Sequence, residues 1–320
     1  MTLVIRPAKE DDLALIMDLS AKEHHSLAIE NAKKSFEKMK SYPDYTLFVL
    51  TDDKHCIGTF SLLIMDNLAH EGAPSGLIDE VVLDLNVARK GIEQKIMDFA
   101  LAHCHKSHCY KLCLPNEAMA VLLMSNEAAH FAQHGKCFVM DLQQKKLRDQ
   151  SQLPSRPMPS DLALRKACAK DLPVILSLYA QPDMDNGKVL SAENAVAMYH
   201  KMMAYPNYMI YVAHLDEQIV GTFALLITPG LAHQDKAVGI VEDVMVAPKT
   251  QGKGVGKFMM NSALQIAAEH DCGKLVLSSN IKRVIAHNFY KSLGFQSVGA
   301  SFLVKPQVEL FAELACSMHL

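Results

Sequence analysis

The chain has 320 residues, a hydrophobic fraction of 50% and a formal net charge of −3. This length predicts about two domains, and the near-neutral charge without a basic stripe excludes a typical binder of duplex DNA. No stretch reaches the ~18 uninterrupted apolar residues of a membrane helix, and no signal-like segment opens the sequence. We therefore expect no nucleic-acid or membrane partner, a cytoplasmic location, and free thiols for the eight cysteines.

Several segments of the first half return in constant register in the second half. One or two short matches arise by chance, but a long matched series indicates a duplicated domain. His70 and His233 are one matched pair, each after the longest strand of its copy, and presence in both copies favours a structural role. The matched segments are Tyr42–Tyr45 with Tyr205–Tyr208, Gly58–Ile64 with Gly221–Ile227, Leu68–His70 with Leu231–His233, Ile78–Val81 with Val241–Val244, and Lys111–Leu112 with Lys274–Leu275.

The repeats define residues 1–142 as the first copy and residues 161–320 as the second, with a linker over 143–160 that is rich in Pro and Ser. Near the end of the first copy, residues 103–109 (HCHKSHC) carry metal-capable side chains. All of them lie at the end of one expected helix and its turn, whereas structural zinc takes paired ligands from two separated segments. We therefore predict no metal site.

The elements of the second copy follow from its periodicity. An extended start over 162–165, like that over 4–6 in the first copy, leads to a helix over 193–203 with apolar residues at helical spacing. We then expect strands over 209–213, 219–227, 239–246 and 274–278, helices over 257–270 and 284–293, and a C-terminal helical extension over 308–318. This order predicts an α/β (α+β) fold of two tandem domains, each a mixed, mostly antiparallel sheet flanked by helices.

The strongest chemical signal is the glycine-rich segment 251–256 (QGKGVG), between an expected strand and an expected helix. Glycine lets the backbone approach a ligand closely, and the N–H groups and positive dipole of a helix N-terminus suit the two phosphates of a coenzyme. A flexible glycine turn is the alternative, but the strand before it and the helix after it favour a phosphate site. The residues predicted to bind the diphosphate are Gln251, Gly252, Lys253, Gly254, Val255, Gly256 and Lys257.

Residues 241–256 (VEDVMVAPKTQGKGVG) resemble motif A of the GNAT (Gcn5-related N-acetyltransferase) superfamily, whose spacing is matched by Gln251, Gly254 and Gly256. Residues 286–295 (AHNFYKSLGF) resemble motif B of the same family. The resemblance covers the second copy and, more weakly, the first. It implies an acyltransferase that moves acetyl from acetyl-CoA to a primary amine by direct attack in a ternary complex. A dinucleotide-binding Rossmann fold is disfavoured, because the loop follows a late strand.

The resemblance also assigns the coenzyme's pantetheine arm to a gap between two splayed strands, here residues 241–246 and 275–278. Backbone groups of Val244, Met245 and Val246 are expected to hold this arm, and Asn288 is expected to contact the coenzyme from the following helix.

Catalysis needs a base for the amine and an acid for the departing thiolate. Glu242 and Asp243 are the candidate bases. Because side chains alternate along a strand, only one of them faces the amine unless a bulge turns the chain, and we favour Glu242 slightly. Tyr290 is the acid that the resemblance implies. The structural alternative for Glu242 and Asp243 is that both are surface charges at the end of a strand. The structural alternative for Tyr290 is a core tyrosine on an amphipathic helix.

In the first copy, residues 88–93 (ARKGIE) stand where the second copy has its glycine loop. Glu93 replaces Gly256, which would set a carboxylate against a diphosphate, and Ala132 is aligned with Tyr290. We therefore expect the first copy to be non-catalytic, with a structural or substrate-shaping role. A site for a different ligand is the alternative.

Residues 278–283 (SSNIKR) look like those of small-amine members of the family, above all aminoalkylphosphonate N-acetyltransferases, whose substrates carry an anion beside the amine. Asn280, Lys282 and Arg283 are therefore candidate substrate contacts, with a solvated basic loop as the alternative. Three other functions stay open: a protein or peptide N-acetyltransferase, a tandem enzyme resembling mycothiol synthase, and a non-catalytic acetyl-CoA-binding regulator. We expect a monomer with pseudo-dimeric halves or a homodimer.

Overall fold

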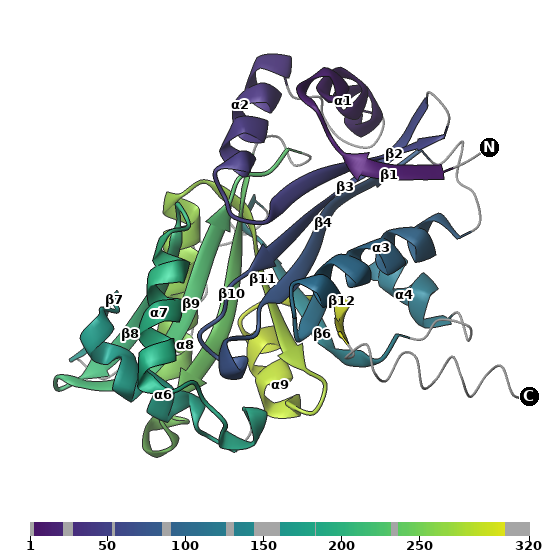
Figure 1. The fold of residues 1–320 in the computed structure, drawn as a ribbon. Helices are drawn as coiled ribbons and strands as arrows, with labels where there is room; N and C mark the ends of the chain where they lie inside the picture. Colours follow the sequence, from purple (N-terminus) through teal and green to yellow (C-terminus); the bar gives the residue numbers. More distant parts are fainter. Residues whose placement is uncertain are drawn as a thin grey trace, which may run out of the picture.

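The computed structural model describes residues 3–21, 28–52, 55–84, 91–125, 131–143, 161–182, 184–231 and 236–304. In these ranges all the strands join one twelve-stranded sheet with helices on both faces (Figure 1). Only two strand pairs are parallel, β4 with β5 and β10 with β11. The predicted fold class, mostly antiparallel sheet flanked by helices in both copies, is confirmed. None of the helices in these ranges is long and apolar enough to cross a membrane.

The first copy has one strand and two helices, then three consecutive strands, and then two helices that alternate with two more strands. Its elements are β1 (Leu3–Pro7), α1 (Leu13–Ala21), α2 (Ile29–Lys40), β2 (Tyr45–Asp52), β3 (His55–Met65), β4 (Ser75–Leu83), α3 (Ile92–Lys106), β5 (Lys111–Leu114), α4 (Glu117–Ser125) and β6 (Gln133–Asp141).

The second copy repeats this order, and the strands and helices predicted between residues 162 and 293 are confirmed to within a few residues. Its last strand, β12, was not predicted. Its elements are β7 (Leu162–Lys166), α6 (Leu172–Tyr179), α7 (Ala192–Met203), β8 (Tyr208–Leu215), β9 (Gln218–Thr228), β10 (Ala237–Val246), α8 (Val255–Glu269), β11 (Cys272–Asn280), α9 (Val284–Ser292) and β12 (Gln296–Leu303).

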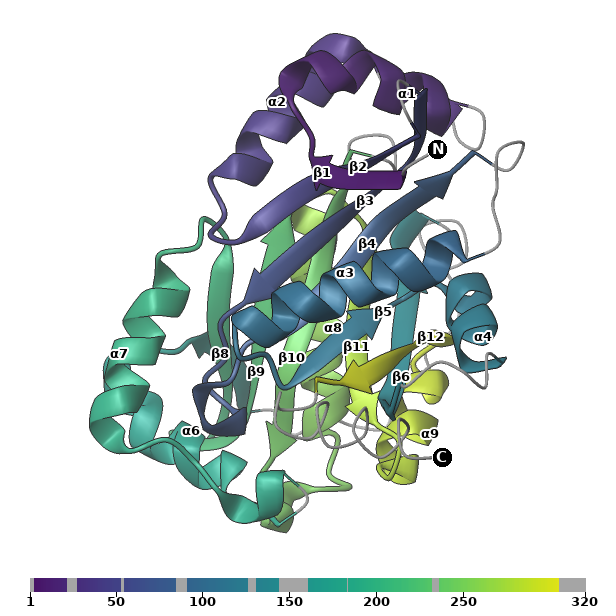
Figure 2. The same cartoon turned by 45° about the vertical axis from the view of Figure 1, so that its right-hand side comes forward.

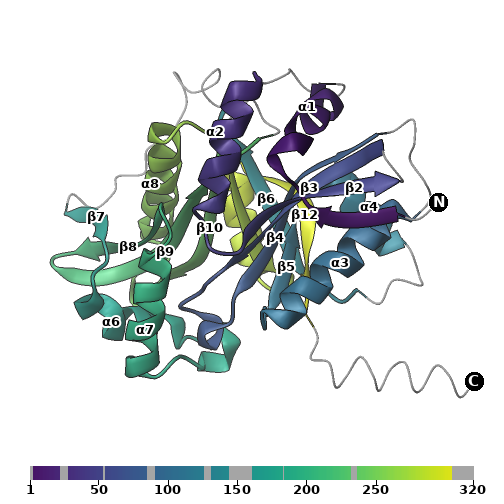
Figure 3. The same cartoon turned by 45° about the horizontal axis from the view of Figure 1, so that its top comes forward.

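The last strands of the two copies are exchanged. Strand β12 of the second copy pairs with β5 of the first, and strand β6 of the first copy pairs with β11 of the second. The two exchanged strands also pair with each other and so join the halves (Figure 3). The strand order is β1-β2-β3-β4-β5-β12-β6-β11-β10-β9-β8-β7. Residues 143–160 separate the repeats in sequence, but strand pairing crosses this boundary in both directions.

Three large apolar cores pack against the sheet in the described residues. One lies under α1, α2, α6 and α7 and contains residues of both copies. The second lies under α8 and α9 and includes Phe138 of β6. The third lies under α3 and α4 and includes Phe302 of β12; Figure 2 shows α3 crossing this part of the sheet. Each outer core therefore contains a side chain from the other copy.

Reciprocal hydrogen bonds also join the two halves. The Tyr45 hydroxyl donates to the Pro229 carbonyl at 3.2 Å, and the hydroxyl of its counterpart, Tyr208, donates to the Asp66 carbonyl at 2.9 Å. The halves therefore meet in a pseudo-twofold arrangement, in which this contact of one copy is repeated by the other.

Candidate active site

The loop between β10 and α8 contains two glycines with left-handed backbone. The φ angle is 75° at Gly252 and 90° at Gly254, values that glycine adopts without the strain a Cβ brings. A Cβ built at either position meets no protein atom within 4 Å, so the space over the loop is open. Gly91, before α3 in the first copy, has a matching φ of 93°, which indicates that this turn is part of the shared fold.

The first turn of α8 provides hydrogen-bond donors. The N–H groups of Val255, Gly256 and Lys257 occupy its first three positions, where no carbonyl within the helix accepts them. Together with the positive end of the helix dipole, these groups form an anion-binding surface. The side-chain amide of Gln251 donates to the carbonyl of Val246 at 3.2 Å and so fixes the loop to the end of β10.

Strands β10 and β11 separate beside this loop. Their parallel pairing runs from Ala237 with Cys272 to Val241 with Leu277, and in the described strands it does not continue beyond that point. On its other edge β10 stays paired with β9, with a bulge between Glu242 and Met245. The end of β10 therefore presents to the gap backbone groups that β11 does not pair.

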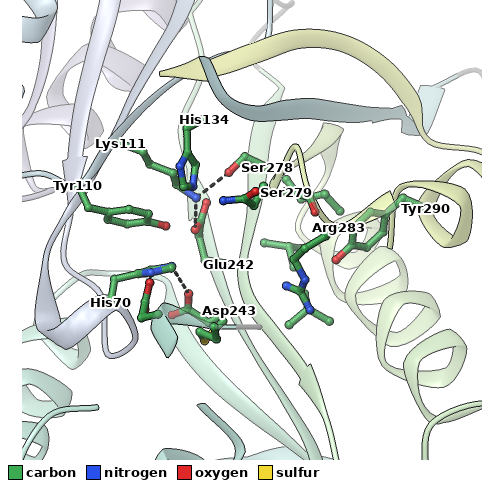
Figure 4. A pocket seen from close by; sticks show the side chains of 16 residues that line it. His70, Tyr110, Lys111, His134, Glu242, Asp243, Ser278, Ser279, Arg283 and Tyr290 are labelled. Atoms are coloured by element: carbon green, nitrogen blue, oxygen red, sulfur yellow. Dashed lines mark hydrogen bonds and ion pairs between the residues drawn. The ribbon is translucent and has the colours of Figure 1, made fainter. Parts of the chain in front are cut away.

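A cavity opens where the two strands separate, and both copies line it (Figure 4). The bulge at Asp243, whose φ is 57°, turns both neighbouring carboxylates into the cavity, which strict alternation along a strand would prevent. Six of the predicted site residues line the cavity: Glu242, Asp243, Val244, Asn280, Arg283 and Tyr290. The other predicted site residues do not line it: Met245, Val246, the loop residues 251–257, Lys282 and Asn288.

Four lining residues come from the first copy, and the motifs do not predict them: His70, Tyr110, Lys111 and His134. His70 and Lys111 stand in the matched repeat segments, where they read as structural. The sequence did contain one signal: both copies carry the lysine (Lys111, Lys274) and the acidic pair (residues 79–80 and 242–243). A repeat alone does not show that the lysine of one copy meets the acidic pair of the other.

Glu242 is held in a buried ion pair. The Lys111 Nζ atom donates to Glu242 Oε2 at 2.7 Å and to Ser278 Oγ at 2.6 Å, and both charged side chains are 5% exposed. Burial acts to lower the pKa of Lys111, but the charge of and hydrogen bond to Glu242, together with Tyr110 and Cys113, outweigh it and hold that pKa well above its ordinary value. Glu242 is thus the counter-ion of a buried lysine, and removing its charge would leave that lysine unpaired.

The same ion pair recurs at the pseudo-symmetric position. Lys274, the counterpart of Lys111, donates to Asp79 Oδ1 at 2.7 Å, and Asp79 is the counterpart of Glu242. In sequence, residues 88–93 (ARKGIE) stand beside this second pair in place of the glycine loop, yet the ion pair is kept. The repeated pair is therefore explained by the contact between the halves.

Asp243 is contacted by neutral donors. With the Asn67 amide oriented by its hydrogen-bond network, its nitrogen donates to Asp243 Oδ2 at 2.5 Å and its oxygen accepts from Ser75 Oγ at 3.1 Å. The Asp243 side chain is 1% exposed, and this burial raises its pKa to about 6. Asp243 is therefore ionised at neutral pH and has a proton affinity in the range that suits a general base.

His70 approaches Asp243 from the first copy. Its Nε2 atom lies 3.9 Å from Asp243 Oδ1, and its Nδ1 atom lies 2.7 Å from Oδ2 of Asp185. The imidazole stacks on the ring of Tyr110, with 3.8 Å between the ring centroids. An imidazole therefore stands between two carboxylates of the second copy.

Tyr290 and Arg283 lie on the other side of the cavity (Figure 4). Tyr290 is buried and packs against Phe138 of the exchanged strand β6, with 5.6 Å between ring centroids. Burial raises the pKa of Tyr290, so its hydroxyl keeps its proton at neutral pH. The side chain of Asn280 accepts from the Lys282 backbone N–H at 2.9 Å, which forms the turn before Arg283.

The alignment of Ala132 with Tyr290 is wrong. Residues 133–141 form β6, which takes the place of β12 in the pseudo-twofold arrangement, so Ala132 precedes a strand and is not part of a helix. The counterpart of Tyr290 falls within residues 126–130, outside the described residues. Residues 88–90, His233 and residues 308–318 are also outside them.

The motifs recur in known proteins. Residues 176–295 match the model of the acetyltransferase (GNAT) family. The chain is 29% identical over 118 residues to a glucosamine 6-phosphate N-acetyltransferase of Candida albicans, an alignment that covers 36% of this chain and 77% of that protein. It is 32% identical over 99 residues to N-acetylaspartate synthetase of Homo sapiens, which covers 31% of each chain. The aligned segment thus spans about a third of the human protein.

A solved structure extends the likeness over both halves. The tandem GNAT protein from the clavulanic acid biosynthesis pathway gives a TM-score of 0.50 with 15% identical residues, over 95% of this chain and 99% of that one. At this identity the likeness concerns the fold alone, a tandem of two domains of the same kind.

Proposed function

We propose that the second copy, whose residues 176–295 match the model of the acetyltransferase (GNAT) family, transfers acetyl from acetyl-CoA to the primary amine of a small anionic metabolite, with the first copy completing the acceptor site. The observation that carries this proposal is the cavity at the separation of β10 and β11, lined by Glu242, Asp243 and Tyr290.

The coenzyme's diphosphate is assigned to the loop 251–257, where open space lies over Gly252 and Gly254. The unpaired N–H groups of the first turn of α8 face such a ligand, and Lys253 adds positive charge. The pantetheine arm then enters the gap between β10 and β11, which leads toward the cavity. In this arrangement the thioester reaches the two carboxylates from the side of Tyr290.

The base is assigned to Asp243, in place of the slight preference for Glu242 that the sequence gives. Glu242 is tied to Lys111 at 2.7 Å, whereas Asp243 has a pKa raised to about 6 by burial. Asp243 removes a proton from the acceptor ammonium, and the neutral amine attacks the thioester carbon. The Tyr290 hydroxyl supplies a proton to the departing thiolate and regains one from the nitrogen that becomes the amide.

An anionic group beside the amine is the expected feature of the acceptor. Arg283 and Lys111 both line the cavity, and a guanidinium suits carboxylate and phosphate oxygens. The names of two relatives, glucosamine 6-phosphate N-acetyltransferase and N-acetylaspartate synthetase, both specify anionic amines. The resemblance to aminoalkylphosphonate enzymes stays a prediction within this class.

The proposal is tested by incubating the full chain with acetyl-CoA and single amines and following release of the free coenzyme thiol. The panel contains hexosamine 6-phosphates, aspartate and aminoalkylphosphonates, matched neutral amines such as glucosamine, and peptides with free N-termini. Turnover with anionic amines and little with their neutral partners is the expected result. Turnover with peptides alone, or thiol release with none of the amines, would overturn it.

Replacing the base gives a sharper test. Asp243→Asn is expected to lower kcat by about 100-fold or more, with an unchanged coenzyme dissociation constant by calorimetry. Since catalysis needs ionised Asp243, wild-type activity should fall as the pH drops below about 6. Glu242→Gln is the matched variant: it leaves Lys111 unpaired and lowers Tm, with a smaller loss of kcat. A larger kcat loss in folded Glu242→Gln than in Asp243→Asn would return the role to Glu242.

A further inference from the structure

Acetylation of an amine at neutral pH releases a proton, and this argument rests on the proposed function. An acceptor ammonium carries three N–H bonds and the amide product carries one. One of the two lost protons goes to the departing thiolate, which leaves as the free thiol. The other must reach solvent in every turnover, and it first resides on the base, Asp243.

Asp243 has little direct access to solvent. Its side chain is 1% exposed before any substrate is bound, and the acceptor and the thioester occupy the cavity that it faces. A proton held on Asp243 therefore needs a route through protein groups.

Such groups continue outward from Asp243. Nε2 of His70 lies 3.9 Å from Asp243 Oδ1, and Nδ1 of the same ring lies 2.7 Å from Asp185 Oδ2. The exposed fraction of the side chains rises along this line, from 1% at Asp243 to 17% at His70 and 30% at Asp185. The three side chains thus lead from the closed end of the cavity toward the surface, and they alternate between the two copies. The facing atoms His70 Nδ1 and Asp185 Oδ2 are themselves buried, at ion-pair distance.

The backbone at all three positions is unusual. The φ angle is 57° at Asp243, 54° at His70 and 46° at Asp185, the left-handed region that non-glycine residues rarely adopt. Such conformations persist where the surrounding structure enforces them, and they concentrate at functional sites. Glu80, the counterpart of Asp243, also has a positive φ, so the shared fold accounts for this conformation at Asp243. The positive φ at His70 and Asp185 is therefore the stronger indication of a functional site.

The surroundings hold His70 in this position. The segment before it is anchored at Asp66, whose carboxylate receives Lys201 Nζ at 2.6 Å and the Tyr205 hydroxyl at 2.9 Å. The His70 ring lies against Tyr110.

The other groups near this array are less suited to carry the proton. Burial lowers the pKa of His134 to about 4, so it stays neutral at neutral pH. Burial raises the pKa of Tyr110 well above its ordinary value, which keeps it protonated. Glu71, beside His70, lies 3.9 Å from Lys188 at the surface, and Lys111 is committed to Glu242.

We propose that His70 of the first copy and Asp185 of the second form a proton-release relay for Asp243. The amine N–H bond breaks as an O–H bond forms on Asp243. This proton passes to Nε2 of His70, while the proton on Nδ1 passes to Asp185 and from there to water. Charge and proton number balance in this pass, which leaves the His70 proton on Nε2 instead of Nδ1. The relay returns to its starting tautomer when the ring exchanges that proton for one on Nδ1, through water or by rotation. His70 and Asp185 do not touch the reacting atoms in this scheme and act through Asp243.

The test uses the full chain with the best amine from the panel. His70→Gln and Asp185→Asn are expected to lower kcat about tenfold to a hundredfold, with unchanged coenzyme affinity. The variants should also make kcat depend on buffer: added imidazole carries the proton and restores turnover in His70→Ala, while wild-type kcat stays independent of imidazole. His200→Gln, an exposed histidine on α7, is the control and should behave like wild type.

The outcomes separate the two proposals. If wild type acetylates amines and His70→Gln keeps its kcat and pH profile, the relay is overturned and the function stands. A kcat loss that imidazole does not restore and that leaves the pH profile unchanged assigns His70 a structural role, which also overturns the relay. If wild type acetylates no amine, both proposals fail. Should His70→Gln not fold, as judged by Tm, Asp185→Asn decides by the same readouts.

Discussion

Gly254 and Gly256 lie two positions apart, but the chain needs glycine at each for a different reason. Gly254 has a φ of 90°, where any side chain is strained. Gly256 does not have a positive φ, and a Cβ there would lie 3.4 Å from Phe289, an ordinary contact. The fold therefore accepts a small side chain at position 256, and the absence of a larger one is explained by the coenzyme proposed to lie there.

Gly256→Glu is expected to raise the dissociation constant for acetyl-CoA by about 100-fold or more. A carboxylate beside the diphosphate costs on the order of a few kcal/mol at intermediate dielectric. Calorimetry measures the change, and Gly256→Ala is the control, with near wild-type affinity and Tm. If the Glu variant binds as tightly as the Ala variant, the diphosphate does not lie against this turn.

At the scale of elements, each copy begins with the same Arg–Asp pair. Arg165 on β7 donates two hydrogen bonds to Asp171 before α6, at 2.6 and 2.8 Å. Arg6 on β1 does the same to Asp12 before α1, at 2.7 Å for both. These bidentate pairs tie the first strand of each copy to the helix that follows it. The hydrogen bonds from Arg165 hold the pKa of Asp171 well below its ordinary value.

Asp171→Asn is expected to lower the free energy of unfolding by about 1–2 kcal/mol at pH 7. Because the folded-state pKa is depressed, the ionised carboxylate stabilises the fold above its ordinary pKa, and this stability is lost as the pH falls through the folded-state value. The gap between variant and wild type should therefore shrink in acid. Urea titrations at pH 7 and at pH 3 measure it, and an equal gap at both would contradict the ionic role of this pair.

The second copy illustrates how much of the elements the sequence predicts. Val and Ile runs and helical spacing located β8 to β11 and α7 to α9 because each follows a local period. The partner of each strand is not a local property: nothing in residues 133–141 or 296–303 says that they pair with strands of the opposite copy. For the same reason the sequence does not decide whether the strand bulges at Asp243, because the bulge depends on pairing with β9. Glu242, Asp243 and Tyr290 were found through motifs, and His70 and Lys111 were missed because they join the site from another part of the chain.

At the scale of the whole molecule, the strand exchange makes the halves interdependent. Strand β6 lies between β12 and β11, and β12 lies between β5 and β6. Separating the copies would break three strand pairs and expose edges with unpaired backbone groups on four strands, β5, β6, β11 and β12. It would also remove Phe138 and Phe302 from the outer cores that contain them.

A protease site placed between residues 143 and 161 tests this interdependence. After cleavage, the two fragments are expected to elute together in size-exclusion chromatography under native conditions and to retain acetyl transfer. Fragments that separate without denaturant would show that the copies are closed units. An uncleaved sample treated in parallel is the control.

Lys111 and Lys274 occupy equivalent places, and so do Glu242 and Asp79. In an assembly of two identical chains, one codon sets both members of each such pair, and every substitution appears on both sides at once. Joining the copies in one polypeptide removes that constraint. One copy is then free to carry Glu93 where the other has Gly256 and still to contribute its lysine and its histidine to its neighbour. The two sides of the pseudo-twofold axis can therefore evolve under different selection.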